Sequence, residues 1–337
     1  MGVGEVALTS FADVAGQEKA KRILRLAFGR GKTSHAYLFQ GPAGVGKKLT
    51  ARAFAAFLHC RAEGRDDSCG HCPSCRKTAS GNHPDLLVLE PDGAQIKIDQ
   101  IRELKRTLSY PPVEAGDRVV VVPDIHQTMA RAEVANSLLK TLEEPPAQTV
   151  FILTAVEAAG ILPTIVSRCQ VIPFYPLPYA LVSAALTADG VAADKAYAMA
   201  SIAEGSIGRA RALAKTDLLE VRREIVEGLT RLTTRGPGAV EQLFALAEQA
   251  ALLKDELVDL LELLKLWLKD LMVLAAGGPI EAVVNQDLHH TLAQARERWS
   301  HPQLVERVAL IHKAERQLRH NCNRAFVCEV LFWAFVG

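Results

Sequence analysis

The sequence lacks the features that mark several special classes of protein. Only 6% of its 337 residues are aromatic, and 39 Lys and Arg residues nearly balance 38 Asp and Glu residues, which gives a net charge of +1. This balance argues against a uniformly basic surface that coats nucleic acid, although it leaves room for a local basic face. With 49% hydrophobic and 23% charged residues, the composition is that of an ordinary globular protein, and the length suits two or three domains.

Signals for export and for membrane insertion are also missing. The N-terminus has neither the cationic start nor the apolar core of a signal peptide. The most apolar stretch, Leu257 to Ala276, is interrupted by charged residues and therefore indicates an amphipathic helix instead of a membrane span. Seven cysteines without an export signal favour thiols or a metal site, so we expect a cytoplasmic protein.

Strand and helix patterns alternate in the first half of the chain. Apolar runs at 36–39, 85–89, 118–122 and 150–154 predict strands, and the segments between them predict helices. This alternation implies an α/β fold with a largely parallel sheet and right-handed crossovers. Three prolines between 173 and 178 mark a domain boundary, after which the patterns are helical. The leucines spaced between 246 and 271 indicate a helical core or a subunit interface, and their spacing does not distinguish the two.

The segment GPAGVGKKLT at 41–50 contains most of a phosphate-binding loop. Gly41, Gly46 and Lys47 match G-x-x-x-x-G-K, Gly44 lies between them, and the segment connects a strand to a helix. Such a turn directs several N–H groups to one point, and the lysine completes a cradle for phosphates. The next residue, however, is Lys48, where a serine or threonine should hold Mg²⁺.

The acidic residues that ATP hydrolysis requires are also incomplete. The strand at 118–122 leads into Asp124, and Ile125 follows where an ATPase usually carries a second acid. Asp124 is therefore either a residual metal ligand or a residue of the turn. Thr50 is not expected to replace the hydroxyl missing at Lys48, because two residues along a helix correspond to about 200° around it. The pattern leaves open whether ATP or ADP binds to the loop.

A cluster of cysteines predicts a metal site. It consists of Cys60, Cys69, Cys72 and Cys75. Two C-x-x-C steps bring three thiolates together, and the loop before them returns the first cysteine to complete a tetrahedron. Such a set leaves no position for water, so we expect a structural zinc ion, with free or redox-active thiols as the alternative. We expect the zinc hairpin to contact protein, with DNA as the alternative, and the neighbouring His59, His71 and His83 to be solvated and not ligands.

Four segments, taken together, resemble a known family. They are FADVAGQEKAKRIL, SHAYLFQGPAGVGKK, NSLLKTLEEPPAQTVFILT and SRC, in this order. Over about residues 1–215 the sequence resembles the bacterial DNA polymerase III clamp-loader subunits of the AAA+ superfamily. The resemblance implies an AAA+ P-loop domain over 1–173 with the zinc module at 60–75, a helical lid over 174–216 and an all-α collar domain over 217–337, where the leucines would pack.

At four positions the sequence departs from the ATP-hydrolysing members of that family. In these departures it resembles the delta-prime branch, which also carries the four-cysteine module. The ATP-hydrolysing subunits have a hydroxyl residue after the loop lysine, an Asp-Glu pair, a sensor threonine and a lid arginine. The corresponding positions here hold Lys48, Asp124-Ile125, Ala155 and Gly208, while Thr154 and Arg209 each lie one place away. The resemblance therefore implies a subunit with no activity of its own, which serves the DNA polymerase III holoenzyme.

The resemblance implies a catalytic role for the turn formed by Ser167, Arg168 and Cys169. It implies that Arg168 is an arginine finger, which reaches the ATP of a neighbouring subunit and stabilises charge on its γ-phosphate. An ordinary exposed ion-pair partner is the alternative for an arginine in such a turn.

The resemblance also implies the partners. We expect a hetero-pentamer with delta and gamma/tau subunits, which acts on the sliding clamp and on primed DNA. Two other interpretations stay open, namely an ATP-hydrolysing subunit of the gamma/tau type and a zinc-dependent DNA-binding module. Nothing in the sequence supports a polymerase active site in this chain.

Overall fold

The computed structural model describes residues 10–93, 95–114, 116–129, 132–157, 161–232 and 237–336. The chain forms two compact units, Met1–Leu177 and Pro178–Gly337. The finer division of the chain into three parts, with boundaries after residues 173 and 216, stays a prediction.

The first unit is built on a parallel sheet of five strands. The strands are β1 (Ala36–Gln40), β2 (Leu86–Val88), β3 (Arg118–Val122), β4 (Thr149–Ala155) and β5 (Gln170–Pro173). Their order is β2-β3-β4-β1-β5, and each neighbouring pair is parallel. The α/β fold with a parallel sheet is thus confirmed. The sequence pattern does not predict β5, because this strand is short and two of its four residues are exposed.

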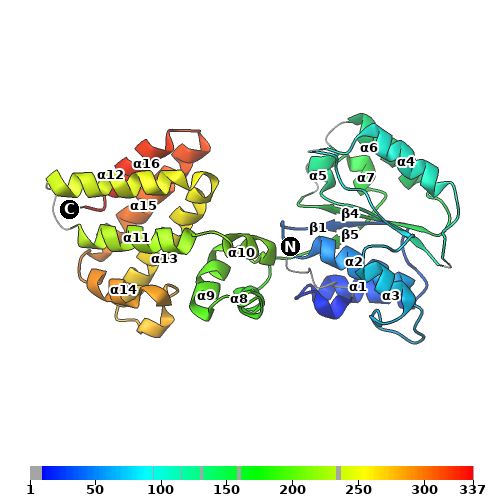
Figure 1. The fold of residues 1–337 in the computed structure, drawn as a ribbon, viewed down its shortest axis with the longest axis horizontal. Helices are drawn as coiled ribbons and strands as arrows, with labels where there is room; N and C mark the ends of the chain where they lie inside the picture. Colours follow the sequence, from blue (N-terminus) through cyan, green and yellow to red (C-terminus); the bar gives the residue numbers. More distant parts are fainter. Residues whose placement is uncertain are drawn as a thin grey trace. The chain divides into compact units, whose positions relative to one another are not determined.

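Helices cover both faces of the sheet (Figure 1). On one face lie α4 (Ile98–Leu108), α5 (Ile125–Thr128), α6 (Ala132–Glu143) and α7 (Pro163–Val166). On the other face lie η1 (Phe11–Asp13), α1 (Glu18–Gly29) and α2 (Lys47–His59), with α3 (Pro73–Ala79) packed beside α2. Successive side chains of β4 enter opposite cores, as Phe151 and Ile152 do. Since all strands are parallel, the segments that follow β1, β3 and β4 meet at one edge of the sheet.

The second unit is helical throughout its described residues. Its α-helices are α8 (Tyr179–Ala188), α9 (Ala193–Ile202), α10 (Ile207–Leu213), α11 (Leu218–Arg231), α12 (Pro237–Leu252), α13 (Leu257–Ala275), α14 (His289–Ala295), α15 (His301–Arg319) and α16 (Arg324–Trp333), and short turns of 3-10 helix are η2 (Lys254–Glu256), η3 (Ile280–Ala282) and η4 (Gln286–Leu288). Across the described residues, none of the helices is long and apolar enough to cross a membrane.

The leucines of α13 fill the interior of this unit. Leu257, Leu260, Leu264 and Leu271 are at most 1% exposed. Of the two alternatives that the leucine spacing left open, the helical core is therefore the one confirmed for these four residues, because the unit's own helices cover them. The spacing of leucines could not show this, since a core and an interface require the same amphipathic period.

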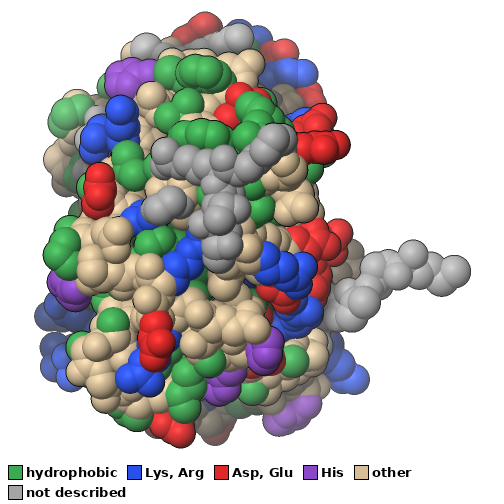
Figure 2. Space-filling model, turned by 90° about the vertical axis from the view of Figure 1, so that its left-hand side faces the viewer, with side chains coloured by type: hydrophobic (Ala, Val, Ile, Leu, Met, Phe, Trp, Pro, Cys, Tyr) green, Lys and Arg blue, Asp and Glu red, His purple; other side chains and the backbone are tan. Residues whose placement is uncertain are grey.

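Exposed apolar side chains lie instead on α16 and α12. Phe326, Val330 and Trp333 follow one another at helical spacing on α16 and are 65%, 51% and 38% exposed. Phe244 and Leu252 of α12, which packs against α16, are also exposed. On the face drawn in Figure 2, several hydrophobic side chains gather in the upper part, and charged and histidine side chains are scattered over the whole face. An apolar surface of this kind is typical of a protein contact.

Candidate functional site

The phosphate loop between β1 and α2 has the turn that its glycines predict. Gly41, Gly44 and Gly46 have φ angles of 156°, 70° and 101°. A Cβ atom at Gly41 would lie only 2.3 Å from the carbonyl oxygen of Phe174, so the close approach of the chain after β5 requires a glycine there. Gly46 lies in the left-handed region immediately before α2. The loop therefore presents the N-terminus of α2 as a phosphate-binding loop does.

Gln17 holds this loop to the segment after β5. Its Nε2 donates to the carbonyl oxygens of Val45 at 3.2 Å and Tyr175 at 2.7 Å, and its Oε1 accepts from the Tyr175 N–H at 3.2 Å. Gln17 is 8% exposed. Sequence reasoning misses this residue, because a glutamine before a helix gives no signal of contacts so far along the chain.

Lys47 bends back onto its own loop. Its Nζ donates to the carbonyl oxygens of Gly41 at 2.6 Å and Pro42 at 2.7 Å. The side chain is buried, and burial lowers the pKa of Lys47, while the Asp124 carboxylate acts in the opposite direction. The cation is therefore close to the position expected for phosphates but is hydrogen-bonded within the loop.

The position that should bind Mg²⁺ offers no hydroxyl. Lys48 forms an ion pair of 2.6 Å with Glu90, and both side chains are about half exposed or more. Thr50 is fully buried, and its hydroxyl donates to the carbonyl oxygen of Gly46 at 2.9 Å. As helix geometry predicts, Thr50 does not take the place of the missing ligand.

Asp124 and Thr154 meet at the ends of β3 and β4. The Asp124 N–H donates to Thr154 Oγ1 at 2.9 Å, and this hydroxyl lies 3.4 Å from Asp124 Oδ1. Ala155, the residue at the expected sensor position, packs into the core on the other face of the sheet. Ile125 is 3% exposed in that same core, so no second carboxylate follows Asp124. Thr154, one place before the expected sensor position, is therefore the hydroxyl residue that meets Asp124.

The position expected for the lid arginine lies in the second unit and holds a glycine, and the arginine that follows it is paired with acidic residues. Gly208 lies in the first turn of α10, and Arg209 follows it. Arg209 contacts Asp259 at 2.5 Å and Glu204 at 3.2 Å. Its charge is therefore already neutralised within this unit.

The four cysteines of the first unit converge, as their spacing predicts. The Sγ atoms of Cys60, Cys69, Cys72 and Cys75 all lie within 4.8 Å of one another. The Sγ atoms of Cys69 and Cys75 are 4.0 Å apart. Backbone N–H groups of the hairpin point at three of the sulfurs, over 3.3–3.4 Å, and α3 begins directly after Cys72. Such a cluster could hold a metal ion.

Two of the three nearby histidines are buried, which corrects the expectation that they are solvated. The rings of His59 and His83 stack with centroids 4.0 Å apart, and only His71 is exposed. His59 Nε2 lies 2.8 Å from the Asp117 carbonyl oxygen, and His83 Nε2 lies 2.8 Å from Ser74 Oγ. Burial, with His83 nearby, lowers the pKa of His59 to about 4, and burial also lowers the pKa of His83. The stacked rings therefore pack against α3 through the contact of His83 with Ser74.

The Ser-Arg-Cys turn connects α7 to β5. Ser167 ends α7, and its hydroxyl donates to the Thr164 carbonyl oxygen at 3.1 Å. Cys169 packs against the core, and burial raises the pKa of its thiol to about 11, so it is not a reactive thiolate. The Arg168 side chain is 36% exposed, and its Nη2 lies 2.8 Å from Oε1 of Glu143. This turn therefore presents one guanidinium at the surface.

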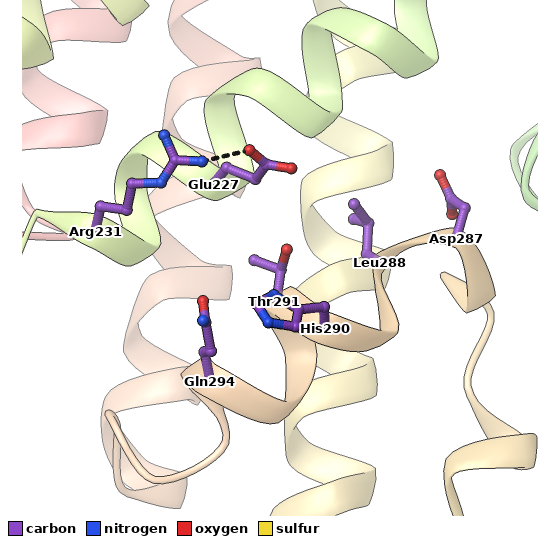
Figure 3. A pocket seen from close by; sticks show the side chains of 7 residues that line it. All are labelled: Glu227, Arg231, Asp287, Leu288, His290, Thr291 and Gln294. Carbon is purple, nitrogen blue, oxygen red and sulfur yellow. Dashed lines mark hydrogen bonds and ion pairs between the residues drawn. The ribbon is translucent and has the colours of Figure 1, made fainter.

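A hollow of about 200 Å³ in the second unit does not form a comparable site (Figure 3). Seven residues line it, namely Glu227, Arg231, Asp287, Leu288, His290, Thr291 and Gln294. Glu227 and Arg231 pair with each other at 2.7 Å, and Asp287, at the far end of the view in Figure 3, pairs with the buried Arg222. The charged groups are thus already paired and do not converge on one point.

Comparisons with known proteins agree with the geometry of the first unit. A family model described as DNA polymerase III, delta subunit, matches residues 16–178. The DNA polymerase III subunit delta' of Bacillus subtilis is 29% identical over 310 residues, which cover 91% of this chain and 92% of that protein. The subunit delta' of Pseudomonas aeruginosa is 38% identical over 209 residues, covering 60% of this chain and 63% of that protein.

A related subunit type is also similar. The DNA polymerase III subunit gamma/tau of Mycobacterium tuberculosis is 38% identical over 192 residues, which cover 56% of this chain but only 33% of that longer protein.

Proposed function

The chain belongs to the delta-prime family of bacterial DNA polymerase III clamp-loader subunits, and from this we propose that it serves the loader without hydrolysing ATP and completes a neighbouring subunit's ATP site with Arg168. The observation that carries the proposal is a contrast between two sites of one unit. The hydrolytic ligands of the chain's own loop are missing, whereas the Ser-Arg-Cys turn is intact and its arginine is partly exposed.

The chemistry of the chain's own loop supports the first half of the proposal. Hydrolysis requires a metal ion bound after the loop lysine and an acid that orients the attacking water. Lys48 places a cation paired with Glu90 at the first position, and Ile125 places a buried aliphatic side chain at the second. With neither group available, the loop serves as a structural element, and Asp124 keeps only its contact with Thr154.

The chemistry of Arg168 supports the second half. A guanidinium is always charged and planar, so it can bind two phosphate oxygens at once and stabilise charge as the γ-phosphate is transferred. An arginine supplied by another subunit is worth roughly 10³–10⁵ in rate. Ser167 ends the helix before Arg168, and the partly buried Cys169 packs against the core after it. These neighbours would give the finger a rigid base.

We further infer that the cysteine cluster binds one structural zinc ion. Zn–S bonds of 2.3 Å in a tetrahedron correspond to sulfur separations of about 3.8 Å, close to the 4.0 Å between Cys69 and Cys75. When bound, zinc would supply a crosslink and no catalytic position, because four thiolates complete its coordination. Cys60 at the end of α2 and Cys72 at the start of α3 would then be fixed to each other. The hairpin would be a contact surface for protein.

The partners follow from the family. We infer that the chain assembles with delta and gamma/tau subunits into a hetero-pentamer, and that this assembly acts on the sliding clamp and on primed DNA. The C-terminal domain over 217–337 would join the collar. The exposed Phe326, Val330 and Trp333 of α16 support this inference, because such a row of apolar side chains suits packing against another helix.

One observation favours a second candidate, an ATP-hydrolysing subunit of the gamma/tau type. Thr154 contacts Asp124 as a sensor threonine would, and the gamma/tau relative is 38% identical over its matched part. Against it stand Lys48 and Ile125, which remove two groups that hydrolysis requires.

Nucleotide assays on the isolated chain separate the two candidates. Calorimetry with ATP and Mg²⁺ measures binding, and release of inorganic phosphate measures turnover. The proposal expects no release above the background of a protein-free sample. Steady turnover by the purified chain would support the hydrolysing candidate instead.

A further inference from the structure

Glu143 and Arg168 join two segments that lie apart in the sequence. Glu143 is the last residue of α6, and Arg168 lies in the turn between α7 and β5. Oε1 of Glu143 is 2.8 Å from Nη2 of Arg168. The other acceptors of the guanidinium are the Thr164 carbonyl oxygen of α7 at 2.9 Å and Ser167 Oγ, directly after α7, at 3.4 Å. Among the described residues, Glu143 alone ties this guanidinium to an element other than the adjoining α7.

The pair leaves part of the guanidinium available. An arginine carries five N–H groups in a planar fork. Thr164 and Ser167 accept hydrogen bonds from Nη1, whereas the Glu143 carboxylate forms an ion pair with Nη2. Among the described residues only Nη1 donates hydrogen bonds, so Nε and Nη2 keep N–H groups for another acceptor. Two such donors in one plane match two oxygens of a phosphate group.

The ion pair between Glu143 and Arg168 contributes little to the stability of the fold. The two side chains are 36% and 42% exposed, and ion pairs with this exposure add little to the stability of a fold. The ion pair instead orients the Arg168 guanidinium, since an unpaired arginine samples many rotamers. A guanidinium held at both Nη atoms is fixed before it meets its target, which is how preorganised groups raise rates.

We propose that Glu143 is the positioning residue for Arg168. Its carboxylate fixes the guanidinium so that the two free N–H groups face a phosphate group held by a neighbouring subunit. This inference rests on the proposed function of Arg168 and adds the residue that prepares it. Glu143 contacts no nucleotide in this account and acts only through the arginine.

The test uses the loader reconstituted with its partner subunits, in which the DNA-stimulated ATPase rate is measured against ATP concentration. Glu143→Ala should lower kcat about three- to tenfold, less than the roughly 10²-fold cost of full misplacement, and leave KM for ATP unchanged. Glu143→Gln should restore most of the rate, because its amide oxygen can occupy the same place against Nη2. Glu144→Ala removes the adjacent exposed carboxylate and is the matched control, with an unchanged rate expected.

Combination with Arg168→Ala separates the inference from the proposed function. If Arg168→Ala lowers the rate and Glu143→Ala then adds no further loss, the carboxylate acts through the arginine. If Arg168→Ala lowers the rate but Glu143→Ala alone does not, or raises it, only the inference is overturned. The same loss from Glu143→Ala with and without Arg168 would also overturn it, because that result indicates a role apart from the arginine. If Arg168→Ala has no effect, the proposed function itself fails.

Discussion

The ammonium nitrogen of Lys47 lies 2.6 Å from the carbonyl oxygen of Gly41, at the opposite end of the same loop. A second bond, to Pro42, completes its contacts within the loop. A phosphate group that used Lys47 would have to replace both bonds to a buried cation. The lysine that usually recruits ATP therefore stabilises the loop itself, which agrees with a loop kept for its structure.

Restoring the missing hydroxyl should not create an ATPase. Lys48→Thr returns the loop to the full G-x-x-x-x-G-K-T pattern and removes the ion pair with Glu90. We expect phosphate release by the isolated variant to stay at background, because Ile125 still provides no acid to orient water. Phosphate release with ATP and Mg²⁺ measures this directly. Clear turnover by Lys48→Thr would mean that the second departure does not matter.

The phosphate loop should tolerate no side chain at Gly41. In Gly41→Ala, the new Cβ would lie 2.3 Å from the carbonyl oxygen of Phe174. We expect a loss of about 1–3 kcal/mol in the free energy of unfolding, as for other overpacked sites. Urea unfolding measures this loss.

Gly29→Ala is the matched control for that substitution. Gly29 ends α1, and a Cβ there would meet no atom within 4 Å, so its effect should stay within about 0.5 kcal/mol. Equal losses from both variants would contradict the close approach of the loop to the chain after β5.

The cysteine cluster should carry one zinc ion per chain. Cys72→Ala removes a thiolate from the four that lie within 4.8 Å, and we expect its zinc content to fall from about one ion to near zero. The thermal midpoint should fall as well, because metal binding stabilises the folded hairpin. Elemental analysis and thermal unfolding measure the two effects.

Cys322→Ala is the matched control for the zinc site. Cys322 is exposed in the second unit and lies outside the cluster. It should keep the zinc content and the thermal midpoint of the unchanged chain. Zinc lost equally from both variants, or absent from the unchanged chain, would contradict the site.

The sequence predicts the regular elements well where the local pattern is strong. The strand at 118–122 has the bounds that its continuous apolar run predicts, and the strongly amphipathic α4 lies in one of the segments predicted to be helical. The sequence misses β5 because its hydrogen bonds to β1 hold a strand that is half exposed. A single-sequence pattern contains no information on such pairing.

The parts of the site that depend on strand register and burial are less visible in the sequence. Which of two adjacent residues at the end of β4 faces Asp124 is decided by the pleat, and Thr154 does so in place of Ala155. Likewise, His59 and His83 look like surface residues near a metal hairpin but stack in its interior. Neighbours from other elements determine these positions, and local composition does not report them.

The central claim is that this chain contributes Arg168 to catalysis while its own loop contributes none. The measurement is the DNA-stimulated ATPase rate of the reconstituted loader with Arg168→Ala, compared with Lys48→Ala, which removes another exposed cation of the same unit. We predict a loss of at least about tenfold for Arg168→Ala, since a finger is worth roughly 10³–10⁵ at the site that it serves, and no change for Lys48→Ala. An unchanged rate with Arg168→Ala, or an equal loss with Lys48→Ala, would contradict the account.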